Sequence, residues 1–295
     1  MTKPTLKLGF TDTIEPVKDF FTETLSVDFD IIRDDVNPDY LIFGDRNFGN
    51  HNESFTNCTK IFYTGENQRP WDYKCHYAIT FDHFDTPNHY RLPLYIIYDW
   101  DNKRKGVANS EGRKYFSRSI HTYYDDYNSK EFCSFVVKNP SCQMRNNFFH
   151  KLCQYKKVDS AGPLFNNTGI KLDHGENAVQ EKLAFIQKYK FNLCFENASY
   201  PGYATEKLYE ALIAKTVPIY WGSPTIALDF NPNAFLSWHN YQDDDKFIEA
   251  IKEVENDYGK WHSMTGSPIW SPYNKSIDLD RFRFWFRKNV YSGSK

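Results

Sequence analysis

Three consecutive segments decide the fold of this chain: Phe191-Asn-Leu-Cys-Phe195, Thr205-Glu-Lys-Leu-Tyr-Glu-Ala-Leu-Ile-Ala-Lys215 and Val217-Pro-Ile-Tyr-Trp221. The first and third are short apolar runs, which are typical of buried strands. In the second, Leu208, Ala211 and Leu212 recur at the spacing of one helix face. Thr205 can cap this helix, and Glu206 suits its positively charged first turn. A strand, a helix and a strand in this order predict a βαβ unit and therefore a parallel sheet.

Strands and helices are expected in the rest of the chain as well. Short apolar or alternating runs predict strands at Leu6–Phe10, Val27–Ile32, Tyr40–Gly44, Lys60–Thr64, Tyr77–Phe81, Leu92–Ile97 and Phe132–Val137. Apolar residues at helical spacing predict helices at Ile14–Leu25, Met144–Tyr155 and Asp243–Tyr258. The aromatic and basic tail Asp278–Val290 is interpreted as a terminal helix, although Arg281–Arg287 alternates as a strand would. Asp99–Asp126 is charged and rich in tyrosine, and its pattern assigns no element. The sequence therefore predicts an α/β protein, and the length of 295 residues is comfortable for two domains.

The bulk composition excludes several classes of protein. The charge is nearly balanced, with 36 Lys and Arg residues against 38 Asp and Glu residues, so we expect no nucleic-acid partner. No segment reaches the roughly 18 apolar residues of a membrane span, and the start of the chain lacks the apolar run of a signal peptide. The six cysteines are scattered without a Cys-x-x-Cys pair, which favours reduced structural thiols. These features predict a cytoplasmic protein without an integral membrane segment, with attachment to a membrane surface as an open alternative.

Several common functional motifs do not occur in the sequence. A Walker A motif and a Gly-x-Gly-x-x-Gly pattern are both missing, which argues against an ATPase or a dehydrogenase. The nine histidines form no His-Glu-x-x-His pattern, and Asp243-Asp-Asp245 is better explained as the first turn of a helix than as a metal site. We therefore expect neither a metal ion nor a cofactor. The 25 Phe and 21 Tyr residues mostly indicate a packed core, with stacking surfaces for sugar rings as the alternative.

Polar residues gather where the predicted strands end, and parallel sheets bind ligands at those ends. After the strand that ends at Phe195, a loop with Pro and Gly leads into the helix that carries Glu206 and Lys207. A helix N-terminus attracts phosphate through its free N–H groups, and Lys207 adds a positive charge there. Glu206 could accept hydrogen bonds from ribose or sugar hydroxyls, and Tyr203 could hydrogen-bond or stack. The competing interpretation is an ordinary capped helix with a solvated Glu–Lys pair.

Two further residues are candidates for a site. Arg145 lies in the first turn of the helix after the Phe132–Val137 strand, where a guanidinium can clamp a diphosphate; a surface arginine is the alternative. Glu66 follows the Lys60–Thr64 strand, and Gly65 permits a sharp turn that could aim the carboxylate into a cleft. A glutamate there could remove the proton from an attacking hydroxyl, although a turn carboxylate in water is the commoner case.

Several stretches of the chain resemble the α1,3-fucosyltransferase family, in particular its soluble bacterial type. In the first half these stretches are Tyr63–Asn67, Tyr77–Asp82 and Arg91–Leu94, followed by Phe132–Pro140 and Met144–Asn146. In the second half they are Phe191–Asn197, Gly202–Lys207, Val217–Ser223 and Asp229–Pro232. The resemblance covers residues 60–240. An ordered series of motifs over such a length is far more specific than a lone glycine motif.

The resemblance implies a GT-B architecture, in which two Rossmann-like domains face a central cleft. On this basis residues 1–130 are expected to bind the acceptor, and residues 131–275 are expected to bind GDP-fucose. Residues 276–295 are expected to form a C-terminal helix, with packing against the first domain as one arrangement. Glu66 would be the general base. Five residues would bind the donor, namely Arg145 and Lys207 at the diphosphate, with Asn197, Tyr203 and Glu206 as further contacts.

The reaction that the resemblance implies is an inverting transfer of L-fucose from GDP-β-L-fucose. The acceptor would be the 3-hydroxyl of N-acetylglucosamine in an N-acetyllactosamine-type glycan, and the product an α1,3 linkage of the Lewis x type. This fold does not need a metal at the diphosphate. Two alternatives stay open: a GT-B transferase that uses another nucleotide sugar, and a glycan-binding protein without catalysis.

Overall fold

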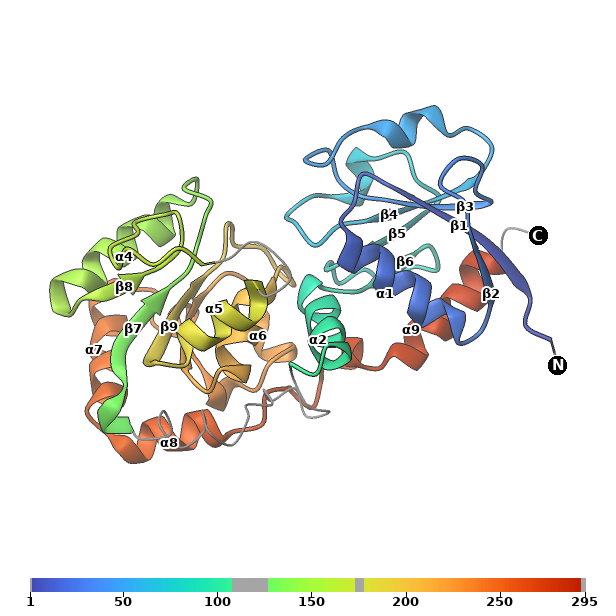
Figure 1. Cartoon of the computed structure of the whole chain (residues 1–295). Coiled ribbons are helices and arrows are strands. Elements are labelled where there is room, and N and C mark those ends of the chain that lie inside the picture. The colour runs from blue at the N-terminus through green and yellow to red at the C-terminus, as the bar shows by residue number, and fades with distance from the viewer. Residues whose placement is uncertain (1, 108–126, 173–177, 293–295) are drawn as a thin grey trace. The chain divides into compact units, whose positions relative to one another are not determined.

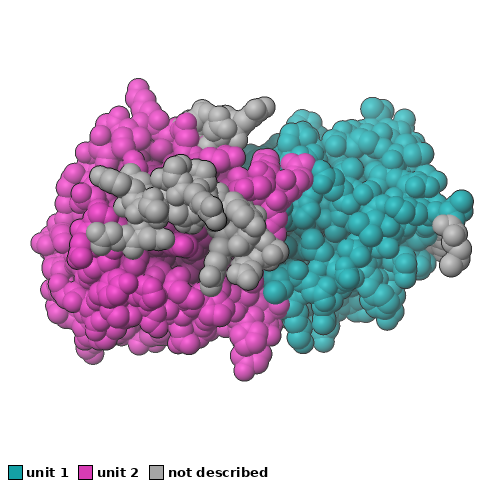
Figure 2. All heavy atoms as spheres, turned by 60° about the horizontal axis from the view of Figure 1, so that its bottom comes forward, with its two compact units in different colours: residues 1–101, 275–295 teal, residues 102–274 magenta. Residues whose placement is uncertain are grey.

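The computed structural model describes residues 2–107, 127–172 and 178–292, which form two compact units (Figures 1 and 2). Unit 1 consists of residues 1–101 and 275–295, and unit 2 consists of residues 102–274. The predicted α/β class with two parallel-sheet domains is confirmed. Residues 108–126, which precede the predicted domain boundary at residue 130, lie outside the described residues. The exact domain limits therefore stay a prediction.

Unit 1 is built on a six-stranded sheet in which each neighbouring pair of strands is parallel. The strand order is β2-β1-β3-β4-β5-β6. The strands are β1 (Thr5–Thr11), β2 (Asp30–Arg33), β3 (Tyr40–Phe43), β4 (Thr59–Tyr63), β5 (Tyr77–Thr80) and β6 (His89–Arg91). Helix α1 (Glu15–Ser26) buries Val17, Phe20, Phe21 and Leu25, which form the apolar face that the sequence predicts.

The predicted strand at Leu92–Ile97 is wrong. Strand β6 ends at Arg91, and helix α2 (Leu94–Arg104) begins directly after Pro93. Proline has no N–H for a sheet, and its fixed φ suits the start of a helix. The N–H of Ile96 donates to the carbonyl oxygen of Pro93 at 3.0 Å. A short apolar run does not distinguish a buried strand from a buried helix segment, which explains the error.

The C-terminal segment forms helix α9 (Leu279–Trp285) and a π-helical turn (Phe286–Tyr291), which confirms the terminal helix and not the strand-like alternative. It packs within unit 1, because the ring of Phe282 lies 5.8 Å from that of Phe21 and Trp285 Nε1 donates to the carbonyl oxygen of Pro87 at 3.1 Å. Each helix in the described ranges is too short or too polar to cross a lipid bilayer.

Unit 2 is built on a five-stranded parallel sheet with the order β11-β10-β9-β7-β8. Its strands are β7 (Glu131–Phe135), β8 (Val158–Ser160), β9 (Tyr189–Phe195), β10 (Val217–Trp221) and β11 (Leu236–Ser237). Its helices are α4 (Gln143–Tyr155), α5 (Ala178–Ile186), α6 (Glu206–Ile213), α7 (Asp244–Glu255) and α8 (Tyr258–Gly266). The predicted β9–α6–β10 unit is confirmed, with Val217 beside Phe191 and Trp221 beside Phe195 in parallel register.

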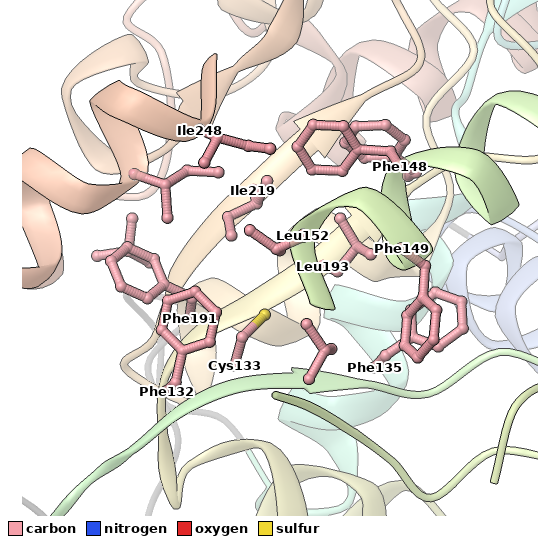
Figure 3. Packing of buried hydrophobic residues seen from close by; sticks show 14 of the residues in the cluster. Phe132, Cys133, Phe135, Phe148, Phe149, Leu152, Phe191, Leu193, Ile219 and Ile248 are labelled. Carbon is pink, nitrogen blue, oxygen red and sulfur yellow. The ribbon is translucent and has the colours of Figure 1, made fainter. Parts of the chain in front are cut away.

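The core of unit 2 fills the space between its sheet and the helices α4 and α7 (Figure 3). Phe191, Leu193 and Ile219 from the sheet meet Phe148 and Leu152 from α4 in this cluster, and all five are at most 1% exposed. Burial of one such side chain contributes about 1.5–3 kcal/mol. The packed core therefore holds the strands in place, and with them the polar residues at the strand ends.

Acidic residues cap the helices α7 and α8, of which the sequence predicts only the first. Asp243 caps α7 by accepting a hydrogen bond from the N–H of Lys246 at 2.9 Å, so the acidic run does begin a helix. The predicted helix over Asp243–Tyr258 is nevertheless too long. Asp257 caps a second helix, α8, through the N–H of Lys260 at 3.0 Å.

The strand order reverses once in each sheet. In unit 1 the reversal lies between β1 and β3, and in unit 2 it lies between β7 and β9. Ligands of open α/β sheets bind beyond the carboxyl ends of the strands at such a switch point. Five of the predicted site residues lie after β7 and β9, either in the loop after β9 or in the first turns of α4 and α6.

Candidate functional site at the carboxyl ends of the strands

Arg145 connects the ends of β7 and β9 at the switch point of unit 2. Its side chain is completely buried. Nη1 donates to the carbonyl oxygen of Phe195 at 3.3 Å and to Asn197 Oδ1 at 2.7 Å, and Nη2 donates to the carbonyl oxygen of Asn139. Its Nε–H is buried without an acceptor among the described residues. Arg145 therefore holds the two loops together, and contact with a diphosphate would require the exchange of at least one of these bonds.

Tyr203 supports this region from inside the protein. Its side chain is completely buried, and its backbone N–H donates to the carbonyl oxygen of Tyr200 at 3.0 Å. Burial lowers the pKa of Arg145, and Cys142, Glu196 and Tyr203 oppose that effect. These groups are thus electrostatic neighbours of the guanidinium. A direct contact between Tyr203 and a bound donor stays a prediction, since it needs the side chain to become accessible.

Glu196 organises the loop between β9 and α6, although it is not among the site residues that the sequence predicts. Its carboxylate is fully buried; Oε1 accepts from the N–H of Thr205 at 2.8 Å, and Oε2 accepts from the Thr205 hydroxyl at 2.7 Å. Lys207 Nζ donates to the same Oε2 at 2.9 Å and to Thr205 Oγ1 at 2.8 Å. The sequence predicts that Thr205 caps α6, but its side chain accepts no hydrogen bond from the N–H groups of that helix. Lys207 is therefore paired with Glu196, and contact with a diphosphate would require the exchange of at least one of these bonds.

A second cation shares the carboxylates at the start of α6. Lys182 on α5 lies 2.5 Å from Glu210 Oε2 and 3.7 Å from Glu206 Oε1, and Lys207 Nζ lies 3.9 Å from the same Glu206 oxygen. Burial alone would raise the pKa of Glu206, but the charges of Lys207 and Lys182 outweigh it and lower that pKa to about 2. Glu206 is therefore ionised at neutral pH, and its carboxylate can only accept hydrogen bonds.

This lowered pKa predicts a pH dependence of stability. The pKa falls from its ordinary value of 4.5 to about 2 on folding. The contribution of Glu206 is therefore fully present above pH 4.5 and is lost as the pH falls towards 2, at a slope of at most about 1.4 kcal/mol per pH unit. We expect the stability of Glu206→Gln to fall less steeply than that of the wild type across this window. Denaturant titrations at several pH values measure the difference, and parallel curves would contradict the assignment.

The loop after β10 is hydrogen-bonded to the loop between β9 and α6. The hydroxyl of Ser223 accepts from the N–H of Gly202 at 2.9 Å, and the N–H of Ser223 donates to Tyr220 Oη at 2.8 Å. A Cβ on Gly222 would lie 2.6 Å from Glu196 Cγ and 2.6 Å from Tyr220 Oη. Close approach to Glu196 therefore requires glycine here.

Gly222→Ala is expected to displace Glu196 and to lower stability by about 1–3 kcal/mol, as overpacking of a buried site does. Urea denaturation measures the loss. Gly266→Ala is a matched control, because no atom beyond its chain neighbours and the backbone of its own helix lies within 4 Å of its added Cβ. Equal stabilities of the two variants would show that the Gly222 site has room.

Two helices point their N-termini at this edge of the sheet. The N-cap of α4 is Cys142 and that of α6 is Thr205, and neither side chain accepts a hydrogen bond from its own helix. The first-turn N–H groups of a helix carry a partial positive charge and attract anions. The ends of β7 and β9 thus combine two such N-termini with Arg145 and Lys207.

Glu66 lies in unit 1, in the loop that follows β4. Its N–H donates to Thr64 Oγ1 at 3.0 Å, and the N–H of Gln68 donates to its carbonyl oxygen at 2.6 Å. A Cβ on Gly65 would lie 2.7 Å from Leu94 Cβ, so close packing requires glycine before Glu66. Glu66 itself is partly exposed. This exposure is compatible with a base that must meet a substrate.

A buried carboxylate holds the Glu66 turn in place. Thr64 Oγ1 donates to Asp45 Oδ2 at 2.8 Å, and both residues are 2% exposed. Because the Thr64 hydroxyl donates to Asp45, its oxygen is free to accept from the N–H of Glu66. Asp45 therefore positions Glu66 through Thr64. Neither residue stands out in the sequence as a site residue, although Asp45 directly follows a predicted strand and Thr64 ends one.

The structure thus brings five predicted residues together and places the sixth in the other unit. Arg145, Asn197, Tyr203, Glu206 and Lys207 lie at the ends of β7 and β9, and Glu66 lies at the end of β4. Lys182 joins Glu196, Asp45 and Thr64 as an addition from the structure, since its partner Glu210 is distant in the sequence. The described residues contain no group of three or more His, Cys, Asp or Glu side chains that could hold a metal ion.

Comparisons with known proteins cover both units. A model of the alpha-(1,3)-fucosyltransferase FucT N-terminal domain matches residues 7–98, and a model of the C-terminal part of glycosyltransferase family 10 (fucosyltransferase) matches residues 126–265. The alpha-(1,3)-fucosyltransferase FucT of Helicobacter pylori is 34% identical over 222 residues, which are 68% of this chain and 45% of that protein. This chain spans less than half the length of the curated relatives that it matches.

Solved structures of alpha1,3-fucosyltransferases are also similar to this chain. A crystal structure of an alpha1,3-fucosyltransferase superimposes with a TM-score of 0.81 at 26% identity, over 98% of this chain and 91% of the other. A crystal structure of an alpha1,3-fucosyltransferase with GDP-fucose gives 0.80 at 26% identity, over 97% and 90% of the two chains.

Proposed function

Because the chain belongs to the α1,3-fucosyltransferase family, we propose that it transfers L-fucose from GDP-β-L-fucose to a glycan hydroxyl with inversion. The acceptor that we propose is the 3-hydroxyl of N-acetylglucosamine in an N-acetyllactosamine-type glycan, which gives an α1,3 linkage. The observation that carries the donor assignment is the similarity, over 97% of the chain, to a fucosyltransferase crystallised with GDP-fucose.

The edge of the sheet in unit 2 suits a nucleoside diphosphate. The N-termini of α4 and α6 offer N–H groups to the diphosphate oxygens, and Lys207 and Arg145 supply positive charge beside them. The Nε–H of Arg145 is buried without a hydrogen-bond acceptor among the described residues. A rearranged site with bound GDP-fucose would supply that acceptor. The ionised Glu206 accepts hydrogen bonds from hydroxyls of the donor. With charge neutralised in this way, the proposed reaction uses no metal ion and no other cofactor.

The proposed chemistry is a single displacement. Glu66 takes the proton of the acceptor hydroxyl as its oxygen attacks the anomeric carbon of fucose. The bond between that carbon and the β-phosphate oxygen breaks, and GDP leaves with the electron pair. Lys207, Arg145 and the helix N-termini stabilise the negative charge that develops on the leaving diphosphate. Attack from the face opposite the leaving group converts the β-linked donor into an α-linked product.

A panel of nucleotide sugars tests the donor assignment against the alternative of another nucleotide sugar. The protein is incubated with N-acetyllactosamine and with GDP-fucose, GDP-mannose, UDP-galactose or UDP-glucose, and nucleotide release is measured. We expect turnover with GDP-fucose alone. Turnover of a UDP-sugar but not of GDP-fucose would contradict the proposal, and glycan binding without turnover of any donor would favour a binding protein.

A further inference from the structure

Two large aromatic side chains are exposed in the loops that follow β4 and β5. Trp71 is 66% exposed and Phe84 is 38% exposed, and their ring centroids lie 5.9 Å apart with an interplanar angle of 44°. The two rings come from different loops and adjoin each other on the surface of unit 1. Adjacent exposed rings of this size are unusual unless they bind something, because burying them would be favourable.

The loops that carry the two rings are held firmly. The Trp71 turn (Pro70–Asp72) is anchored by Arg46 Nη2, which donates to the carbonyl oxygen of Asp72 at 2.8 Å. Phe84 packs edge-on against the ring of His89 at 5.1 Å, and a His89 ring nitrogen lies 3.3 Å from the Phe84 carbonyl oxygen. His89 itself is buried and its other ring nitrogen lies 2.9 Å from the Thr80 hydroxyl. The rings are therefore exposed on a structured surface.

The same loops also carry Glu66. Trp71 lies five positions after Glu66 in the loop after β4, and the two strands β4 and β5 are hydrogen-bonded neighbours. Arg69 joins the loops, because Nη1 lies 3.3 Å from Asp82 Oδ1 and Nη2 donates to the side chain of Asn67. The guanidinium also lies 4.9 Å from the ring of Phe81. Glu66, Arg69 and Trp71 are thus carried by the loop after β4, and Arg69 connects this loop to the loop after β5, which carries Phe84.

We propose that Trp71 and Phe84 form a stacking subsite for a pyranose ring of the glycan acceptor, with Trp71 in the same loop as Glu66. This inference rests on the proposed function. A pyranose has an apolar face of C–H groups and a rim of hydroxyls, and an aromatic ring with polar neighbours complements both. The subsite binds the sugar that adjoins the reacting residue or that residue itself. It sets the affinity for the acceptor without contacting the donor.

Trp71→Ala and the double variant Trp71→Ala/Phe84→Ala test the subsite in steady-state transfer assays with GDP-fucose and N-acetyllactosamine. We expect KM for the acceptor to rise about tenfold in Trp71→Ala, and further in the double variant, as the loss of a stacked ring predicts. KM for GDP-fucose and the rate of GDP-fucose hydrolysis without acceptor should stay within about twofold. Trp71→Phe should retain most of the acceptor affinity, because it keeps a ring.

The control is Phe284→Ala, which removes a 60% exposed ring from α9 in the same unit and should change neither KM. An unchanged acceptor KM in the double variant would overturn the subsite. A parallel loss of donor affinity would also overturn it, since the effect would then be structural. If the wild type transfers no fucose, the proposed function fails. The subsite is then tested by saturation-transfer NMR of N-acetyllactosamine, where a signal that is equal in wild type and Trp71→Ala overturns it.

Discussion

Glu66→Gln is expected to lower kcat for fucosyl transfer by about 10²–10⁴-fold, which is the usual contribution of a general base. Glutamine has nearly the same shape, and the hydrogen bond from the backbone N–H of residue 66 to Thr64 does not depend on the side chain. The loop should therefore keep its conformation while losing the group that takes the proton. Because the predicted donor contacts lie in unit 2, affinity for GDP should be unchanged. Transfer kinetics and calorimetric titration with GDP measure the two quantities.

A matched control distinguishes loss of the base from loss of a surface charge. Glu53 is an exposed glutamate of the same unit, in the short helix His51–Ser54. Glu53→Gln should retain wild-type turnover. Transfer by Glu66→Gln at a rate within about threefold of the wild type would refute the role of Glu66, since the loss of a general base is larger.

The second large effect is expected at the buried pair of Lys207 and Glu196. Lys207→Met leaves the carboxylate of Glu196, which is 0% exposed, without its cation. Removal of one partner of such a pair costs about 3 kcal/mol of stability. The variant should also lose about 10²-fold or more in kcat/KM for GDP-fucose, as the loss of a charged contact to the leaving group predicts.

A double variant separates the two effects. Lys207→Met/Glu196→Gln removes both charges, so most of the lost stability should return, whereas the activity should not. Lys156→Met is the control in unit 2, because Lys156 is paired with the buried Glu255 and lies at the opposite end of α4 from Arg145. It should leave the kinetics of GDP-fucose unchanged. Recovery of activity in the double variant would show that Lys207 serves the fold alone.

The sequence predicts the main elements of the fold because apolar spacing is a local property. The strands at β9 and β10 and the helix between them match the predicted segments closely, and the structure confirms their parallel pairing. The failures arise where the local pattern is ambiguous. The apolar run after Arg91 is a helix because Pro93 starts it, and the helix predicted through Tyr258 divides because Asp257 caps a second one.

Site residues can be predicted from the sequence where they come shortly after a predicted strand. Arg145 and Lys207 were found in this way, because each lies in the first turn of a helix after a predicted strand. What the sequence does not contain is the set of partners. Lys182 forms an ion pair with Glu210 because α5 packs against α6. The guanidinium of Arg145 donates hydrogen bonds to Asn139, Phe195 and Asn197. These contacts depend on the tertiary structure and leave no local signature.

The most direct test of the account is the product that the protein forms from GDP-β-L-fucose and N-acetyllactosamine, examined by NMR. We predict a trisaccharide with α-linked fucose on O3 of N-acetylglucosamine, together with one equivalent of GDP. A β-linked fucose would contradict the single displacement with Glu66 as base. Absence of any fucosylated product, under conditions in which the folded protein binds GDP, would contradict the proposed transfer itself.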